Sequence, residues 1–280
     1  MRIESLENSL PILPVLRGRE SQSQPLIIAL PHSGRVYPPQ FLAESRLGLE
    51  RLRTMEDFDV DHLFAAATEF GAVSIFAPYA RVWLDVNRRV SEIDPALVVL
   101  GNESLQYEVT HLVKNGIGLI PRLVAGSEPI YRQKLTLAEV QRRIDLAYHP
   151  YHLALTELIA ATVARFGSCR IIDAHSMPSR HHRGEELADF VLGDAHGVSC
   201  SPAFLGAVAE GLMAEGFSVA VNQPYAGGFT TQNYGRPSQG VEVLQLEINR
   251  RLYMDESRVE RLPVFEKVKQ SLERIFGRLR

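Results

Sequence analysis

The sequence predicts an α/β fold built on a mostly parallel, mixed sheet flanked by helices. Short, continuous apolar runs of strand length alternate along the chain with longer stretches of helical periodicity. Strands that are apolar on both faces are typical of parallel sheets covered by helices. No internal repeat or linker-like tract divides the 280 residues, so we expect a single domain over residues 1–280.

The expected elements follow one another in a regular order. Apolar runs predict strands at 25–30, 72–77, 81–86, 169–174, 190–192, 218–221 and 241–246. Helical patterns cover 59–70, 138–166, 202–215 and 265–280. Pro150 is expected to break the long helix near His149, and Gly216 to close the third one.

Composition narrows the classes of function. Hydrophobic residues make up 45% and charged residues 22%, which is typical of a globular protein with a sizeable core. The net charge of −3 and the lack of a basic block favour neither nucleic acid nor a membrane as partner. Two distant cysteines, no apparent signal peptide and no membrane-length apolar run lead us to expect a soluble, cytoplasmic protein.

Chemically capable side chains recur directly after the predicted strands. In open α/β sheets, ligands bind outside the carboxyl ends of the strands, so these side chains are expected to converge on one crevice. They are His32, Asn87, His175, Asp194, Asn222 and Glu247.

Two of these residues predict a metal site. His32 follows one strand and His175 another, and imidazole is a common ligand of zinc. Catalytic zinc usually has three protein ligands, and the acidic cluster 56–61 offers the third. We favour Asp57, with Glu56 as the alternative, whereas the other acids suit the charge preference of a helix N-terminus.

The segment 81–89 and the glycine-containing loop after 218–221 suggest where a carboxylate binds. Arg88 can hold a carboxylate in fork geometry and Asn87 adds a neutral donor, with Arg81 a weaker candidate. The alternative for these arginines is a structural ion pair with a neighbour such as Asp85. Asn222 opens the glycine loop and Arg236 lies beyond it, so both are further candidates for substrate binding.

Glu247 closes a predicted buried strand. An acid there is costly unless it is paired or functional. We interpret Glu247 as a general base that takes a proton from an attacking water. The alternative is an ion pair with Arg250 or Arg251. No serine or cysteine has the context of a catalytic nucleophile.

Taken together, the ordered motifs resemble the N-formylglutamate amidohydrolase family over roughly residues 25 to 255. They are Pro31-His-Ser-Gly34, Asp57 with Asp61, the segment 81–88 ending in Asp-Val-Asn-Arg, Pro150-Tyr-His152, Asp173-Ala-His-Ser-Met-Pro178, Asp189 with Gly193-Asp194, Asn222 to Gly228 and Leu246-Glu-Ile-Asn-Arg250.

The resemblance implies a three-layer sandwich related to the zinc carboxypeptidases and the phosphorylase/hydrolase-like fold, as in aspartoacylase and succinylglutamate desuccinylase. Carried over to this sequence, it gives His32 and His175 the roles of zinc ligands and Asn87-Arg88 that of carboxylate binding. Glu247 takes the role of the base. The relatives place an acidic ligand three residues after the first histidine, where this chain has Arg35, so Asp57 is our inference.

The implied activity is hydrolysis of N-formyl-L-glutamate to formate and L-glutamate, as in histidine degradation, by a Zn²⁺-dependent amidohydrolase. Another divalent transition metal is an alternative to zinc. Two other functions stay open: an enzyme that deacylates another N-acyl amino acid or cleaves amides like a carboxypeptidase, and a non-catalytic carboxylate-binding protein. In each case the expected partner is a small molecule.

Overall fold

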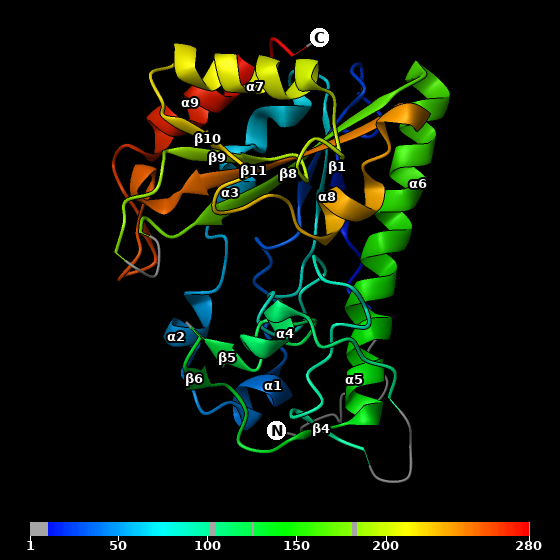
Figure 1. The fold of residues 1–280 in the computed structure, drawn as a ribbon, viewed down its shortest axis with the longest axis vertical. Coiled ribbons are helices and arrows are strands. Elements are labelled where there is room, and N and C mark those ends of the chain that lie inside the picture. Colours follow the sequence, from blue (N-terminus) through cyan, green and yellow to red (C-terminus); the bar gives the residue numbers. More distant parts are fainter. Residues whose placement is uncertain (1–10, 101–104, 125, 181–183, 280) are drawn as a thin grey trace.

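A mixed β-sheet crosses the upper half of the molecule in Figure 1. The computed structural model describes residues 11–100, 105–124, 126–180 and 184–279. Within these ranges, seven strands pair in the order β1-β3-β2-β8-β11-β9-β10. Their bounds are β1 (Val15–Arg17), β2 (Leu26–Leu30), β3 (Val73–Phe76), β8 (Cys169–Met177), β9 (Phe190–Gly193), β10 (Val219–Val221) and β11 (Val241–Asn249).

Neighbouring strands at the middle of the sheet, β3, β2, β8 and β11, run parallel to one another. β9 is antiparallel to β11, β10 is parallel to β9, and β1 is antiparallel to β3. The predicted α/β class and the mostly parallel, mixed sheet are therefore confirmed.

The sheet has a hydrophobic core on each face, because successive side chains of a strand point to opposite sides. Ile27 of β2 lies in one core and Ile28 in the other, and Ile171 and Ile172 of β8 divide in the same way. Side chains of α6 belong to the first core, and those of α7 and α9 belong to the second. Figure 1 shows α7 and α9 together on one side of the sheet. These helices are α6 (His149–Phe166), α7 (Pro202–Ala214) and α9 (Phe265–Phe276).

Smaller elements complete the fold, many of them in the lower half of Figure 1. The remaining α-helices of the described ranges are α1 (Pro39–Glu44), α2 (Leu49–Arg53), α3 (Val60–Leu63), α4 (His111–Lys114), α5 (Leu137–Arg143) and α8 (Phe229–Tyr234). Short strand pairs are β4 (Val98–Val99) with β7 (Leu135–Thr136), β5 (Leu123–Val124) with β6 (Glu128–Pro129), and β12 (Met254–Asp255) with β13 (Glu260–Arg261). None of the helices in the described ranges combines the length and apolar character needed to cross a bilayer.

The predicted strand at 81–86 is wrong. This segment forms turns in which the N–H groups of Trp83 and Leu84 donate to the carbonyl of Ala80. Residues 82–88 are all buried, so their apolar character reflects enclosure on every side rather than the single buried face of a strand. Asp85, Asn87 and Arg88 consequently lie on a turn-rich segment and not at a strand end.

Two helix predictions need a smaller correction. The expected helix 59–70 divides into α3 and a 3₁₀ turn, Ala65–Thr68. The expected break near His149 is instead a π-helical turn, Ile144–Tyr148, which joins α5 to α6. Pro150 has no N–H to donate within the helix, and the π-helical turn accommodates the lost bond without ending the helix.

The strands β8 and β11 run three residues beyond their predicted ends. They pair in parallel along their full length, from Cys169 with Val241 to Met177 with Asn249. Backbone pairing therefore carries both strands past the apolar runs that mark them in the sequence. His175 and Glu247 lie inside these strands, side by side in the register, and not in the loops that follow.

Candidate active site

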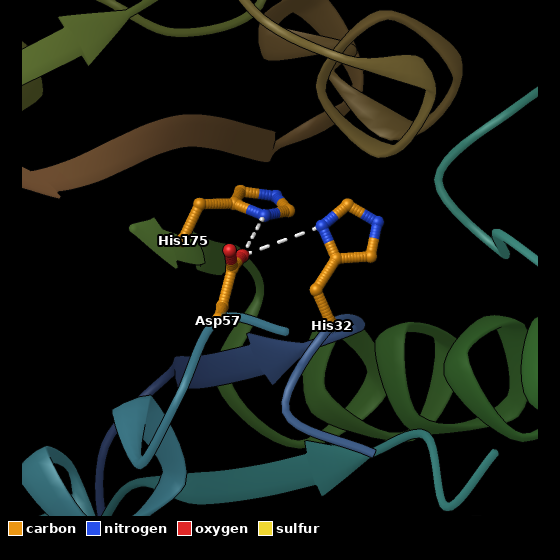
Figure 2. A group of neighbouring side chains, drawn as sticks. All are labelled: His32, Asp57 and His175. Atoms are coloured by element: carbon orange, nitrogen blue, oxygen red, sulfur yellow. Dashed lines mark hydrogen bonds and ion pairs between the residues drawn. The ribbon is translucent and has the colours of Figure 1, made fainter. Parts of the chain in front are cut away.

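His32, Asp57 and His175 meet at one point near the carboxyl ends of the central strands (Figure 2). The Oδ2 atom of Asp57 lies 3.3 Å from Nδ1 of His32 and 3.0 Å from Nδ1 of His175. The two imidazole rings are 4.6 Å apart between centroids. All three side chains are buried. The structure thus brings together the three residues that the sequence suggested as metal ligands.

Pairing within the sheet explains this convergence. β2 and β8 are neighbouring parallel strands, so the residues at their carboxyl ends meet at the same edge. His32 follows β2 and His175 lies near the end of β8. Asp57 comes from the connection between α2 and α3, which its N–H fixes by donating to the carbonyl of His32 at 3.0 Å.

Both histidines turn their Nδ1 atom toward Asp57, and the other ring nitrogen of each lies near a buried carboxylate. Nε2 of His32 lies 2.6 Å from Oδ1 of Asp85, and Nε2 of His175 lies 3.1 Å from Oδ1 of Asp173. At His32, the carboxylate of Asp85 fixes the proton on Nε2 and leaves Nδ1 as a free ligand atom, a common arrangement in metal sites. Nδ1 of His32 is buried and has no hydrogen-bond partner among the described residues, which fits a metal ligand.

The carboxylate of Asp57 presents one oxygen to the histidines and the other to the protein. Ser176 Oγ donates to Oδ1 at 3.2 Å, and Nη2 of Arg250 lies 3.5 Å from the same oxygen. Burial raises the pKa of Asp57, but the two histidines outweigh it and hold the pKa well below its usual range. The carboxylate is therefore ionised, as a metal ligand must be.

Glu56, the alternative ligand, points to a different set of partners. Its Oε1 accepts hydrogen bonds from the Tyr37 hydroxyl at 2.6 Å and from Nε of Arg53 at 3.3 Å. Two further acids of the cluster, Asp59 and Asp61, bind the guanidinium of Arg35. This geometry favours Asp57 as the third ligand.

Glu247 extends from β11 beside His175, and it lines a cavity together with His32, Asp57 and His175. Burial raises the pKa of Glu247 to about 7, and the negative charges of Asp57 and Asp173 add to this effect, whereas His175 and Arg81 oppose it. A carboxyl group with a pKa near neutrality can both accept and return a proton.

The ion pair that the sequence offered as an alternative for Glu247 does not form. Arg250 instead donates to the carbonyls of Thr54 and Glu56. Arg251 pairs with Asp189. The acid is thus buried without a salt bridge to either arginine, which leaves it available for proton transfer.

A cavity of about 780 Å³ opens over this group, and three predicted substrate-binding residues line it: Arg81, Asn87 and Arg88. Nη2 of Arg81 donates to Asp85 at 2.8 Å, and Arg88 donates to the carbonyls of Ile117 and Asn87. Both guanidinium groups contact Asp85, as the ion-pair alternative expected, and both also line the cavity, which suits an anionic ligand.

The amide of Asn87 is already engaged by the protein. Its Oδ1 accepts from the N–H of Thr230 at 2.7 Å, and its Nδ2 lies 3.0 Å from Nε2 of His175. Asn87 therefore lies in the cavity wall, where it contacts both His175 and the segment that contains Thr230.

The other two predicted substrate-binding residues do not line the cavity. Asn222 exchanges hydrogen bonds with Asp194, donating from Nδ2 to its carboxylate at 2.7 Å and accepting from its N–H at 3.1 Å. Arg236 is exposed and donates to the carbonyls of Gln232 and Gly235. Asn222 and Arg236 thus stabilise the loops that they begin and end.

Sequence reasoning did not place several residues that complete the site, and it named Asp85 only as an ion-pair partner of the arginines. Asp85 and Asp173 each contact a histidine of the trio, and each lies two residues before another site residue, Asn87 or His175. Gln245 likewise lies two residues before Glu247 and donates a hydrogen bond to it. On β8 and β11, a polar residue two positions before a candidate shares its face of the strand, and this spacing was the available signal for Asp173 and Gln245. Asp85 lies on the turn-rich segment, where this spacing does not apply. Tyr225, which also lines the cavity, has no comparable signal.

Comparison with known proteins agrees with this geometry. A profile of the N-formylglutamate amidohydrolase family matches residues 24–254 of the chain. An N-formylglutamate deformylase of Pseudomonas aeruginosa is 34% identical over 254 residues, covering 88% of this chain and 86% of the relative. The deformylase of Pseudomonas putida is 30% identical over 242 residues, covering 83% of each chain.

A solved structure extends this likeness to three dimensions. The crystal structure of an N-formylglutamate amidohydrolase from Ralstonia eutropha JMP134 superposes with a TM-score of 0.90 at 38% identity, covering 95% of this chain and 96% of that one. A gene product of Agrobacterium tumefaciens shares the fold, with a TM-score of 0.65 at 16% identity.

Proposed function

The chain belongs to the N-formylglutamate amidohydrolase family, and from this membership we propose that it hydrolyses the amide of N-formyl-L-glutamate to formate and L-glutamate. The observation that carries the proposal is the buried trio of His32, Asp57 and His175 with the unpaired acid Glu247 beside it in one cavity. A role in histidine degradation, which the family resemblance implies, is part of the same proposal.

The trio fits a divalent cation, and we propose Zn²⁺. Two neutral imidazoles and one carboxylate are the protein ligands of many catalytic zinc sites. The Nδ1 atoms of His32 and His175 and Oδ2 of Asp57 would hold the ion. When bound, such an ion polarises a carbonyl group and makes water more acidic.

In the proposed reaction, the two guanidinium groups of Arg81 and Arg88 orient the substrate by its carboxylates. Glu247 accepts a proton from the attacking water and returns it to the glutamate nitrogen as the C–N bond breaks. Arg88 and Glu247 are buried, and burial strengthens the electrostatic interactions that they make.

Substrate choice is tested by assaying the purified, metal-analysed protein against N-formyl-, N-acetyl- and N-succinyl-glutamate and the matching aspartates. The highest kcat/KM is expected with N-formyl-L-glutamate. A clear preference for another acyl group would assign the chain to a different N-acyl amino acid, and hydrolysis of none would contradict the enzyme function.

The role of Glu247 is tested with Glu247→Gln, which keeps the size of the side chain but cannot accept the proton. Turnover should fall by ~10²-fold or more, the usual contribution of a positioned acid–base group. Metal content, measured by elemental analysis, and KM should be retained. Loss of metal would make Glu247 a ligand, and near-normal turnover would remove it from the reaction.

A further inference from the structure

The carboxylate of Glu247 has a single hydrogen-bond partner among the residues that the structure describes. Nε2 of Gln245 donates to Oε1 of Glu247 at 3.1 Å. Gln245 precedes Glu247 by two residues in β11, so both side chains project from the same face of the sheet. Their exposed fractions are only 4% and 8%. A buried carboxylate thus depends on one amide for its orientation.

The orientation of the Gln245 amide is itself fixed by the backbone. The N–H of Gly228 donates to Oε1 of Gln245 at 2.7 Å. A backbone N–H can only donate, so the amide oxygen must face Gly228 and the NH₂ group must face Glu247. The amide therefore cannot flip without losing both bonds.

The position of Gly228 is fixed by contacts with Asn87. A Cβ atom at this position would lie 2.6 Å from Nδ2 of Asn87, so the backbone packs directly on that side chain and only glycine fits. Two residues on, the N–H of Thr230 donates to Oδ1 of Asn87. The loop before α8 is thereby fastened to Asn87 on one side and to Gln245 on the other.

The charged groups around Glu247 would affect the orientation of its carboxylate if nothing held it. Asp57 and Asp173 repel its negative charge, whereas Arg81 attracts it. A carboxylate free to rotate would turn toward the Arg81 guanidinium and away from the reacting water. A neutral donor at Oε1 counters this rotation without adding a charge of its own.

We propose that Gln245 is a positioning residue that holds the carboxylate of Glu247 in the orientation needed for proton transfer, linking it to the Gly228 loop. This inference rests on the proposed function of Glu247. It concerns a residue that acts through the base.

A double-mutant cycle tests this dependence. Gln245→Leu removes both hydrogen bonds at similar volume, and kcat should fall by ~10-fold or more with KM changed little, since misplacement of a catalytic group acts on the chemical step. In the Glu247→Gln background the same substitution should cause no further loss, because the group that Gln245 positions is already gone. Equal losses in both backgrounds would overturn the proposal and make Gln245 purely structural.

Two further variants sharpen the result. Gln245→Glu keeps the size of the side chain and an acceptor for Gly228 but replaces the NH₂ donor, so kcat should again fall while folding and metal content are retained. Gln232→Leu is the matched control, since Gln232 donates to the carbonyl of Gly227 in the same loop but does not contact Glu247. Its effect on kcat should be the same in both backgrounds.

A structural readout separates this inference from the proposed function. In a crystal structure of the Gln245→Leu protein, the Glu247 carboxylate should leave its present rotamer or occupy more than one. An unchanged single rotamer would overturn the inference even if Glu247 is the base. Failure of the wild-type enzyme to hydrolyse any N-acyl amino acid, or normal turnover of Glu247→Gln, would instead contradict the proposed function.

Discussion

Asp57 offers its two carboxylate oxygens to different partners, and this division decides what the residue can do. Oδ1 accepts from Ser176 and faces Arg250, while Oδ2 faces both histidines. The carboxylate of Glu56, its neighbour in sequence, accepts hydrogen bonds from Tyr37 and Arg53. Two adjacent acids thus have separate tasks that follow from the partners each one meets.

The third ligand can be identified by comparing two amide variants. Asp57→Asn should weaken zinc binding by more than the ~10–100-fold typical of losing an outer partner of a ligand, because it removes a charged ligand itself. Glu56→Gln, the matched control, should keep the metal because its side chain points away from the trio. Zinc affinity is measured by competition with a chromophoric chelator. The reverse order of affinities would assign the ligand to Glu56.

Arg88 donates from Nε and Nη1 to two backbone carbonyls, and Nη2 lies 3.5 Å from Asp85. A lysine keeps the charge but cannot make these bonds and also hold a carboxylate. For Arg88→Lys we therefore expect kcat/KM to fall by ~10-fold or more, about 1.4 kcal/mol of transition-state binding. Arg251→Lys is a control outside the cavity. Equal kinetics for both variants would shift substrate binding to Arg81.

At the scale of elements, α6 is tied to the active-site segments through one histidine. Nε2 of His152 donates to the carbonyl of Val86, next to Asn87, and its Nδ1 accepts from the hydroxyl of Tyr234 in α8. The ring also stacks on Tyr234 with an interplanar angle of 18°. A neutral, partly buried imidazole thus connects a long helix, the turn-rich segment and the helix after the glycine loop.

This connection predicts a pH dependence of stability. Burial lowers the pKa of His152 from 6.5 to about 4. The unfolded chain therefore takes up the proton first, so the contribution to stability is complete above pH 6.5 and is lost as the pH falls toward 4. The full effect corresponds to about 3 kcal/mol. Urea unfolding at several pH values should show the difference between wild type and His152→Gln growing with pH over this window. A constant difference would contradict the assignment.

For the whole molecule, the three proposed ligands join parts of the chain that are distant in sequence. His32 follows β2, Asp57 lies between α2 and α3, and His175 belongs to β8. A bound ion would therefore connect these segments in the folded state only, and binding to the folded state alone raises stability.

Metal removal should accordingly lower the melting temperature. At free zinc 100-fold above its Kd, binding adds about 2.7 kcal/mol. For a chain of this size that corresponds to a shift of some ~5–10 °C, measured by calorimetry with and without chelator. In a His32→Ala, His175→Ala double variant the chelator should have no effect. Full zinc occupancy in that variant would place the metal elsewhere.

Local patterns could predict the elements of the sheet but not all of their bounds. Continuous apolar runs identified the central strands because buried parallel strands are apolar on both faces. The same rule failed at 81–86, where a segment enclosed on all sides has the composition of a strand but forms turns. The strand β1, only Val15–Arg17, was not predicted, since so short an edge strand leaves little periodicity to detect.

Side-chain type and periodicity are local properties, so they were enough to predict the fold class and a small set of residues with suitable chemistry, and the order of the motifs was enough to show the resemblance to the family. Only the tertiary structure decided which of these residues work together. It brought Asp57 and not Glu56 to the histidines, turned Asn222 and Arg236 away from the cavity, and gave Gln245 a partner in Glu247. Such pairings depend on strand register and loop paths across distant parts of the chain, and no local pattern encodes the distances that result.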